Sequence, residues 1–118
     1  MSKHIALGKS GENIACKYLQ EKGHQILEQN FRYDHKEIDI ISLDKDVLVF
    51  TEIKSRSNVV FGFPEEAVSP RKQAFLKLAA EYYCLDKPQY QKMRFDVVSI
   101  IIQSEVVKEI IHFEDAFY

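Results

Sequence analysis

The chain has 118 residues, of which 46% are hydrophobic and 29% are charged. This length fits one domain spanning residues 1–118, and the composition argues against a disordered chain. Sixteen Lys and Arg against eighteen Asp and Glu leave a net charge of -2, which gives no support to broad, nonspecific nucleic-acid binding. Any positive surface for a nucleic acid must therefore be local.

The apolar runs are too short to cross a membrane, and the first 20 residues lack the continuous apolar core of a secretion signal. We therefore expect a cytoplasmic protein with no membrane partner. Cys16 and Cys84 belong to no C-x-x-C motif and no Cys/His cluster, so we interpret them as reduced thiols in or beside the core. The histidines show no ligand spacing, which favours surface or boundary positions for His4, His24, His35 and His112.

The first half of the chain predicts a helix followed by three strands. Apolar residues at helical spacing indicate a helix over residues 5–22, which ends at Gly23 and carries Glu12 beside its apolar stripe. Residues 24–33 alternate well enough for a short strand. Residues 37–43 and 47–55 are rich in β-formers and flank a polar turn at residues 44–46, which is typical of a hairpin.

The second half predicts another helix and then one or two strands. Gly62 and Pro64 mark irregular backbone, and Ser69 before Pro70 is a strong helix start. An apolar stripe runs along this helix toward Pro88, formed by Ala74, Leu78, Tyr82 and Leu85. Residues 94–102 read as a buried strand, and residues 106–113 as a further strand or edge element.

The hairpin carries charge inside strands that are otherwise apolar. Strand side chains alternate between faces, so pairing the two strands brings Asp39 and Glu52 level across the ladder, within one register step. Two facing carboxylates are unfavourable unless a cation lies between them, and Mg²⁺ prefers such oxygens. Lys54 would then stand beside the metal-bound water or a phosphate. The alternative is a solvated hairpin face with an Asp–Lys or Glu–Lys cross-strand pair.

Several stretches in order resemble one known family over nearly the whole chain. They are "GENIACKYLQEKGHQILEQNFR", "EIDII", "LVFTEIKSRS", "FGFPEEAV", "SPRKQ" and "RFDVVSI". Together they look like the YraN family of small, poorly characterised bacterial proteins. That family is similar to the restriction-endonuclease-like nucleases, whose signature is Asp, a spacer, then Glu or Asp, any residue and Lys. The resemblance implies an α/β fold with an αβββαβ core, in which helices flank a mixed central sheet.

The resemblance also implies roles for residues of the hairpin and the first helix. Asp39 and Glu52 would bind Mg²⁺ or Mn²⁺ together with the backbone carbonyl of Ile53, and Lys54 would be the lysine of the motif. Glu12 matches a first-helix glutamate that supports the metal site in some members, including archaeal Holliday-junction resolvases.

Residues outside the motif receive weaker assignments. Lys72 or Gln73 would occupy the place of an additional polar residue near the site, and Glu37 would lie in the outer shell. Lys36 departs from the family, which usually has Gly there, and would add positive charge near the substrate. Asp96 either pairs with Arg94 or lies near the site. The side chains expected to contact backbone phosphates are Arg56, Arg71, Lys72 and Arg94.

These features predict a metal-dependent endonuclease that hydrolyses phosphodiester bonds in DNA, including branched, repair or recombination intermediates. No base-reading element is evident, so we expect structure-selective or weakly specific cutting. RNA is not excluded as a substrate, and cutting of both strands of a duplex would imply a homodimer. Two other readings stay open. One is a non-catalytic nucleic-acid-binding module that acts with a partner, and the other is an interaction protein that does not touch nucleic acid.

Overall fold

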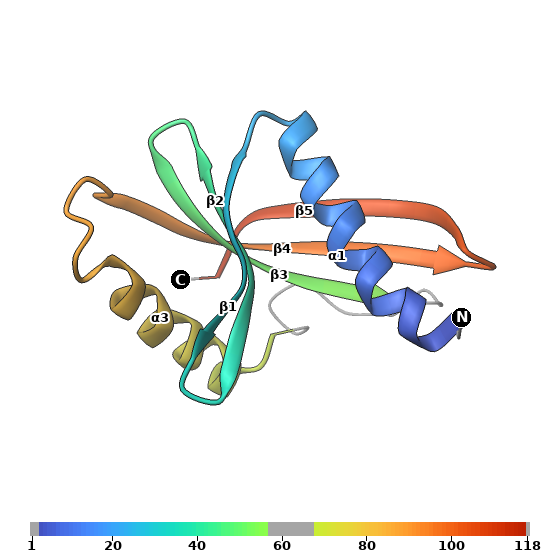
Figure 1. Cartoon of the computed structure of the whole chain (residues 1–118), viewed down its shortest axis with the longest axis horizontal. Helices are drawn as coiled ribbons and strands as arrows, with labels where there is room; N and C mark the ends of the chain where they lie inside the picture. The colour runs from blue at the N-terminus through green and yellow to red at the C-terminus, as the bar shows by residue number, and fades with distance from the viewer. Residues whose placement is uncertain (1–2, 57–67, 118) are drawn as a thin grey trace.

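The computed structural model describes residues 3–56 and 68–117, with only the helical backbone described for residues 3–10. Over these residues a five-stranded mixed sheet carries one helix on each face (Figure 1). The elements in chain order are α1 (Lys3–Glu21), β1 (Gln25–Tyr33), β2 (Lys36–Asp44), β3 (Val47–Arg56), α3 (Pro70–Cys84), β4 (Lys92–Gln103) and β5 (Val106–Phe117). The predicted α/β class and element order are confirmed. The irregular segment predicted around Gly62 and Pro64 lies outside the described residues.

The sheet has the spatial order β1-β2-β3-β4-β5, so each strand pairs with its neighbours in sequence. All pairs are antiparallel except β3 and β4, which run parallel because α3 lies in the connection between them. The predicted hairpin is confirmed, since Asp44 pairs with Val47 across a two-residue turn. Lys45 in that turn has a φ of 58°, the left-handed conformation that tight hairpin turns require.

Helix α1 covers one face of the sheet. Its buried residues Ala15, Cys16 and Leu19 pack on Ile40 of β2 and Val98 of β4. The helix ends as predicted at Gly23, whose φ of 99° suits glycine, and the N–H groups of Gly23 and His24 donate to carbonyls of the last turn. Both cysteines are free thiols, Cys16 buried and Cys84 partly buried, as expected. Neither of the two described helices is long and apolar enough to cross a membrane.

Helix α3 covers the other face and begins as predicted. The Ser69 hydroxyl accepts a hydrogen bond of 3.1 Å from the N–H of Lys72, and Pro70 occupies the first turn. The predicted apolar stripe, however, is not the side that packs on the sheet. The buried residues are Leu76, Ala79, Ala80 and Tyr83, whereas Ala74, Leu78, Tyr82 and Leu85 are exposed. Small alanines let the helix lie close to the sheet, so the larger side chains point outward.

The sheet forks between β2 and β3. Their ladder ends at the pair Ile40 and Thr51, although β2 remains paired with β1 as far as Lys36 and β3 remains paired with β4 as far as Arg56. Figure 1 shows the consequence: the turn between β1 and β2 runs toward the start of α3, while the end of β3 runs beneath the N-terminal half of α1. The fork opens at the position of Asp39 and Glu52.

Candidate functional site

The two carboxylates of the predicted motif meet at the fork. One step beyond the last ladder pair brings Asp39 level with Glu52, as the sequence predicts. No backbone pair forms there, and instead Asp39 Oδ2 accepts a hydrogen bond of 2.8 Å from the N–H of Ile53. The Asp39 side chain thus crosses to β3 and ends beside Glu52. The same hydrogen bond holds the Ile53 peptide, whose carbonyl is the third predicted ligand, against the carboxylate pair.

The pair lies in a poorly hydrated environment. Burial, and then the negative charge of Glu52, raise the pKa of Asp39 from 3.8 to about 7, against the stabilising hydrogen bond from Ile53. Glu52 is only 7% exposed, and its Oε1 has no hydrogen-bond partner among the described residues. A buried oxygen without a donor costs free energy, so the site favours a bound cation or water at this point.

Two lysines lie beside Glu52, and a third lies near one of them. The Nζ atoms of Lys54 and Lys72 lie 3.9 Å and 3.5 Å from Glu52 Oε2. Lys72 comes from the first turn of α3 and Lys54 from β3, so two elements supply the positive charge. Lys36, at the start of β2, contacts the same aromatic ring as Lys72, because their Nζ atoms lie 5.5 Å and 5.7 Å from the ring centre of Phe75. The site therefore combines paired carboxylates with a local group of cations.

Glu12 is hydrogen-bonded to Asn30, a residue that the sequence did not single out. Asn30 Nδ2 donates a hydrogen bond of 3.2 Å to Glu12 Oε2. Asn30 also stands opposite Asp39 in the β1–β2 ladder, because Gln29 pairs with Ile40 and Phe31 with Ile38. Its φ of 53° interrupts the regular strand at that level. An Asn in the middle of a predicted strand is the signal that could have identified it, since Asn tolerates this conformation.

A glycine sets how closely α1 approaches the fork. A Cβ atom on Gly11 would collide with Ser55 Oγ of β3 and would lie 3.2 Å from Ser55 Cβ. Gly11 immediately precedes Glu12, so the close contact between α1 and the end of β3 also fixes the backbone position of Glu12. The absence of a side chain at this helical position is therefore a requirement of packing.

The other predicted residues occupy the following positions. Gln73 donates a hydrogen bond of 2.9 Å to the carbonyl of Val68. Arg56 lies at the end of β3, partly buried, and Arg71 is exposed in the first turn of α3. Glu37 is exposed and stands opposite Arg32 in the ladder.

The structure does not bring Arg94 to this site. Strand alternation places Arg94 with Asp96 and Val98 on the α1 face of the sheet, whereas Glu52 faces α3 with Phe50. Its guanidinium lies 3.0 Å from both Asp44 and Asp96 and 3.2 Å from Glu114. The predicted pairing of Arg94 with Asp96 is therefore confirmed, and in the described structure this guanidinium stabilises the fold through ion pairs.

The surface or boundary positions predicted for His24 and His112 are wrong, because their side chains are only 2% and 1% exposed. Lys22 Nζ lies 2.9 Å from His112 Nδ1, and since an ammonium can only donate, Nδ1 accepts. His112 Nε2 then carries the proton and donates to Asp96 Oδ2 at 2.7 Å. His24 shares a 2.9 Å hydrogen bond with Ser42, and burial lowers the pKa of its imidazole. His35 is exposed, as expected.

The donor set suits a hard divalent cation. Residues 3–56 and 68–117 contain no cluster of three or more His, Cys, Asp or Glu side chains that could hold a metal. Mg²⁺ rarely needs one, because it binds one or two carboxylates and completes its shell with carbonyl, water and phosphate oxygens. Asp39, Glu52 with its unpaired Oε1, and the Ile53 carbonyl offer such a partial set.

Comparison with known proteins identifies the family. Residues 11–100 match the model of the uncharacterised protein family UPF0102. A UPF0102 protein of Flavobacterium psychrophilum is 40% identical over 118 residues, covering 100% of this chain and 98% of the relative. Another, from Desulforamulus reducens, is 44% identical over 115 residues and covers 94% of both chains. A third, from Chloroherpeton thalassium, is 39% identical over 99% of this chain and 97% of its own length.

The matched segment contains the forked hairpin, Glu12, Asn30 and the start of α3. The resemblance to a family of small, poorly characterised bacterial proteins is therefore confirmed, and the chain belongs to the uncharacterised protein family UPF0102.

Proposed function

We propose that this protein is a metal-dependent nuclease that hydrolyses phosphodiester bonds in DNA, with a restriction-endonuclease-like fold. The observation that carries the proposal is the pair formed by partly buried Asp39, hydrogen-bonded to the Ile53 peptide, and buried Glu52, bordered by Lys54 and Lys72. The element order αβββαββ, which contains the αβββαβ core, and the fork between β2 and β3 support the fold assignment. DNA with branches, as in repair or recombination intermediates, is the proposed substrate class.

Some of these residues would hold a cation, and others would neutralise the phosphate. Asp39, Glu52 and the Ile53 carbonyl would hold Mg²⁺ or Mn²⁺, which when bound supplies Lewis-acid stabilisation of a phosphate oxygen and an acidified water. Lys54 stands within 3.9 Å of Glu52, where it would orient the attacking water or stabilise charge on the phosphate. Glu12, through Asn30, would accept a hydrogen bond from a water at the site.

Positive side chains at the rim would bind the phosphodiester backbone. The Nζ atoms of Lys36 and Lys72 lie 5.5 Å and 5.7 Å from the centre of the Phe75 ring. Arg56 and Arg71 lie at the end of β3 and the first turn of α3. Such contacts position a strand without reading its sequence, which fits structure-selective cutting.

The test measures metal binding and cleavage separately. Mg²⁺ and Mn²⁺ are titrated by calorimetry into the wild type, Asp39→Asn and Glu52→Gln, with Glu109→Gln on exposed β5 as a charge-matched control. Cleavage of linear, single-stranded and four-way-junction DNA is followed in parallel. We expect binding and cleavage in the wild type and control, and loss of both in the two site variants. Wild-type protein that binds neither metal and cuts no substrate, with DNA present, would refute the proposal.

One observation favours a second function. Lys54 and Lys72 already pair with Glu52 Oε2, so the carboxylate has cationic partners without a metal. In that case the lysines would serve a non-catalytic nucleic-acid-binding module. DNA binding that weakens steeply with salt, survives Glu52→Gln and needs no divalent cation would support this alternative.

A further inference from the structure

The backbone of Lys72 is fixed at the start of α3, whereas its ammonium is held loosely. The Lys72 N–H donates to Ser69 Oγ at 3.1 Å, and the N–H of Gln73 donates to the Ser69 carbonyl at 2.9 Å. The ammonium lies 3.5 Å from Glu52 Oε2, which is longer than the roughly 2.7–2.9 Å of a tight charge-assisted hydrogen bond. Because the Lys72 side chain is 30% exposed, its ammonium can change partner while the helix stays in place.

The position of Lys72 in the helix is unfavourable unless a negative charge lies nearby. Side chains of the first turn lie at the positive end of the helix dipole, where acidic residues are preferred. Helix α3 has no acidic residue in its first turn and instead carries Arg71 and Lys72 there. In the described structure Glu52 supplies the negative charge for Lys72. A phosphate group would supply it in the same way.

The two oxygens of Glu52 differ in their surroundings. Oε2 faces the ammoniums of Lys54 and Lys72, whereas the buried Oε1 has no hydrogen-bond partner among the described residues. A divalent cation held by this carboxylate would share it with both ammoniums. Like charges around one buried group repel strongly, because little water is present to screen them. We therefore expect one ammonium to leave Glu52 when such a cation is bound.

Lys72 has a second place to bind. Lys54 and Glu52 are two residues apart on β3, so strand alternation keeps their side chains on one face of the sheet. Lys72 comes from α3 instead, and its Nζ also lies 5.7 Å from the ring centre of Phe75. That ring would stabilise an ammonium released from Glu52 and leave its charge available to an anion. The Nζ of Lys36 lies 5.5 Å from the same ring centre, so two positive charges would meet a phosphodiester there.

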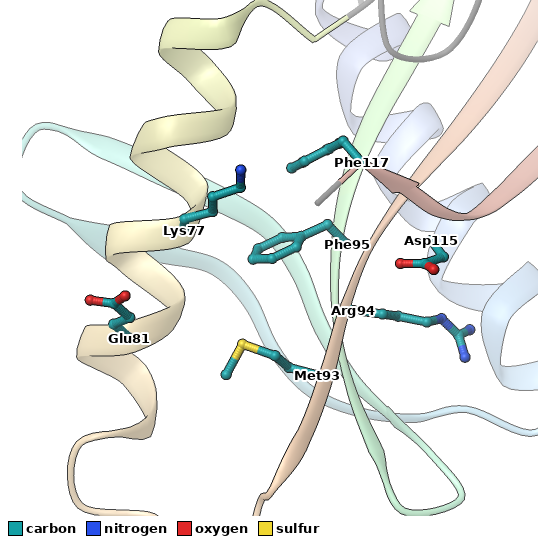
Figure 2. Close-up of a pocket in the computed structure, with 7 residues that line it drawn as sticks. All are labelled: Lys77, Glu81, Met93, Arg94, Phe95, Asp115 and Phe117. Carbon is teal, nitrogen blue, oxygen red and sulfur yellow. The ribbon is translucent and has the colours of Figure 1, made fainter.

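The second lysine of α3 has different surroundings. Figure 2 shows Lys77 on the side of the helix that faces Phe95 and Phe117, where it lines a pocket of about 270 Å³. The residues that line this pocket do not include Glu52. Lys77 lies about 7.5 Å farther along the helix axis than Lys72, at 1.5 Å per residue. It therefore provides a control that removes the same charge from the same helix.

We propose that Lys72 exchanges partners when substrate binds: it neutralises Glu52 in the metal-free protein and moves to a DNA phosphate when Glu52 holds a divalent cation. This inference rests on the proposed nuclease function and adds a form of regulation to its site. Metal and DNA each draw Lys72 away from its contact with Glu52 or use its release, so each should tighten the binding of the other. The cation would then be held firmly only when a nucleic acid is bound.

Lys72→Met tests the exchange, because it keeps the apolar stem of the side chain and removes the charge. Calorimetric titration of Mn²⁺ into the DNA-free proteins should show about three- to tenfold tighter binding by the variant than by the wild type, since Glu52 has lost a competing ammonium. Lys72→Arg keeps the charge and should bind Mn²⁺ about as the wild type does. Lys77→Met should also match the wild type, and thermal unfolding checks that each variant is folded.

The second measurement is the effect of Mn²⁺ on DNA affinity. Fluorescence anisotropy uses labelled single-stranded and four-way-junction DNA with phosphorothioate linkages, which slow cleavage and keep the backbone charge. Mn²⁺ should tighten DNA binding by the wild type and by Lys77→Met at least about tenfold. The gain should be about three- to fivefold smaller in Lys72→Met, because no ammonium is released to the phosphate.

Two results would overturn the exchange while leaving the nuclease proposal in place. One is Mn²⁺ binding by DNA-free Lys72→Met that is no tighter than that of the wild type. The other is an equal gain in DNA affinity from Mn²⁺ in the two proteins. Wild-type protein that binds no Mn²⁺ with DNA present would refute the exchange and the nuclease proposal together.

Discussion

Asp39 accepts a hydrogen bond of 2.8 Å from the backbone N–H of Ile53, one residue beyond Glu52 on the neighbouring strand. A side chain thereby replaces the backbone pair that would have continued the ladder past Ile40 and Thr51. The N–H of Ile53 still has a hydrogen-bond acceptor, but that acceptor is a second carboxylate in the partly buried space around Glu52. At the fork, two carboxylates lie close together although their burial and mutual repulsion are unfavourable.

Because ionised Asp39 is disfavoured by burial and by the charge of Glu52, Asp39→Asn should stabilise the metal-free protein in mildly alkaline solution. Burial, followed by the charge of Glu52, raises the pKa of Asp39 to about 7 in the folded chain. A carboxyl group whose pKa rises on folding holds its proton more tightly when folded, so its contribution to stability falls as pH rises from about 4 to about 7. Asn cannot ionise, so the variant should gain up to about 4 kcal/mol at about pH 8, at about 1.4 kcal/mol per pKa unit.

Urea unfolding in the presence of a chelator measures this difference. The variant and the wild type should have nearly equal free energies of unfolding near pH 4, where Asp39 is protonated in the folded protein. Glu37→Gln, at an exposed carboxylate of the same strand, should show no comparable gain. A variant that is less stable than the wild type at alkaline pH would show that the carboxylate stabilises the fold instead.

The local elements could be predicted because their signals lie within a few residues. The two-residue turn at Lys45 and Asp46, and the helix start at Ser69 and Pro70, depend on backbone conformations that particular residues favour. The pairing of Asp39 with Glu52 followed from the same hairpin, since a short turn fixes the register of both strands. The carboxylates could therefore be placed together before the structure was known.

The remaining features depend on contacts between distant segments. Helix α3 has apolar residues on two sides, and only its closeness to the sheet decides that Ala79 and Ala80 are buried and Leu78 is not. His112 is met by Asp96 and Lys22, and His24 by Ser42 and Asp44, all from other parts of the chain. Asn30 matters because of its φ and its position opposite Asp39, neither of which a residue pattern encodes.

Asn30 provides a prediction that separates backbone strain from side-chain positioning. Asn30→Gly should be about as stable as the wild type, because glycine adopts a φ of 53° without strain, whereas Asn30→Ala should lose about 1 kcal/mol. Both variants lack the amide that donates to Glu12. If the proposed site binds Mn²⁺, both should bind it more weakly by a similar factor. Unchanged Mn²⁺ affinity in Asn30→Gly would show that the amide does not position Glu12.

Gly11 and Ser55 predict a compensating pair of substitutions. Gly11→Ala should destabilise the protein by about 1 to 2 kcal/mol, because the added Cβ collides with Ser55 Oγ and lies close to Ser55 Cβ. Adding Ser55→Gly removes both atoms and should restore most of the loss, helped by the higher helix propensity of alanine. Chemical denaturation of the two single variants and the double variant gives the coupling free energy. Additive effects would mean that α1 does not approach β3 this closely.

The buried carboxylate of Asp96 predicts the acid sensitivity of the fold. Burial alone would raise its pKa, but hydrogen bonds from His112, Arg94 and the N–H of Asp115 outweigh that effect and hold the pKa below its ordinary value. A carboxyl group whose pKa is lowered by folding stabilises the protein above its unfolded pKa of 3.8 and loses that contribution as pH falls through its lower folded pKa. Asp96→Asn should therefore cost about 2 to 4 kcal/mol at neutral pH.

The pH dependence distinguishes the Asp96 charge from the buried histidines. The difference in unfolding free energy between the wild type and Asp96→Asn should stay nearly constant from about pH 5 to about pH 8 and shrink below about pH 4. His24, whose pKa is lowered by burial, loses its contribution as the pH falls below its ordinary value of 6.5, and it should do so in both proteins. Glu109→Gln, on the exposed part of β5, serves as the control for removing one carboxylate. If Asp96→Asn were as stable as the wild type at neutral pH, the network of Arg94, His112 and Asp96 would not hold α1 and β5 on the sheet.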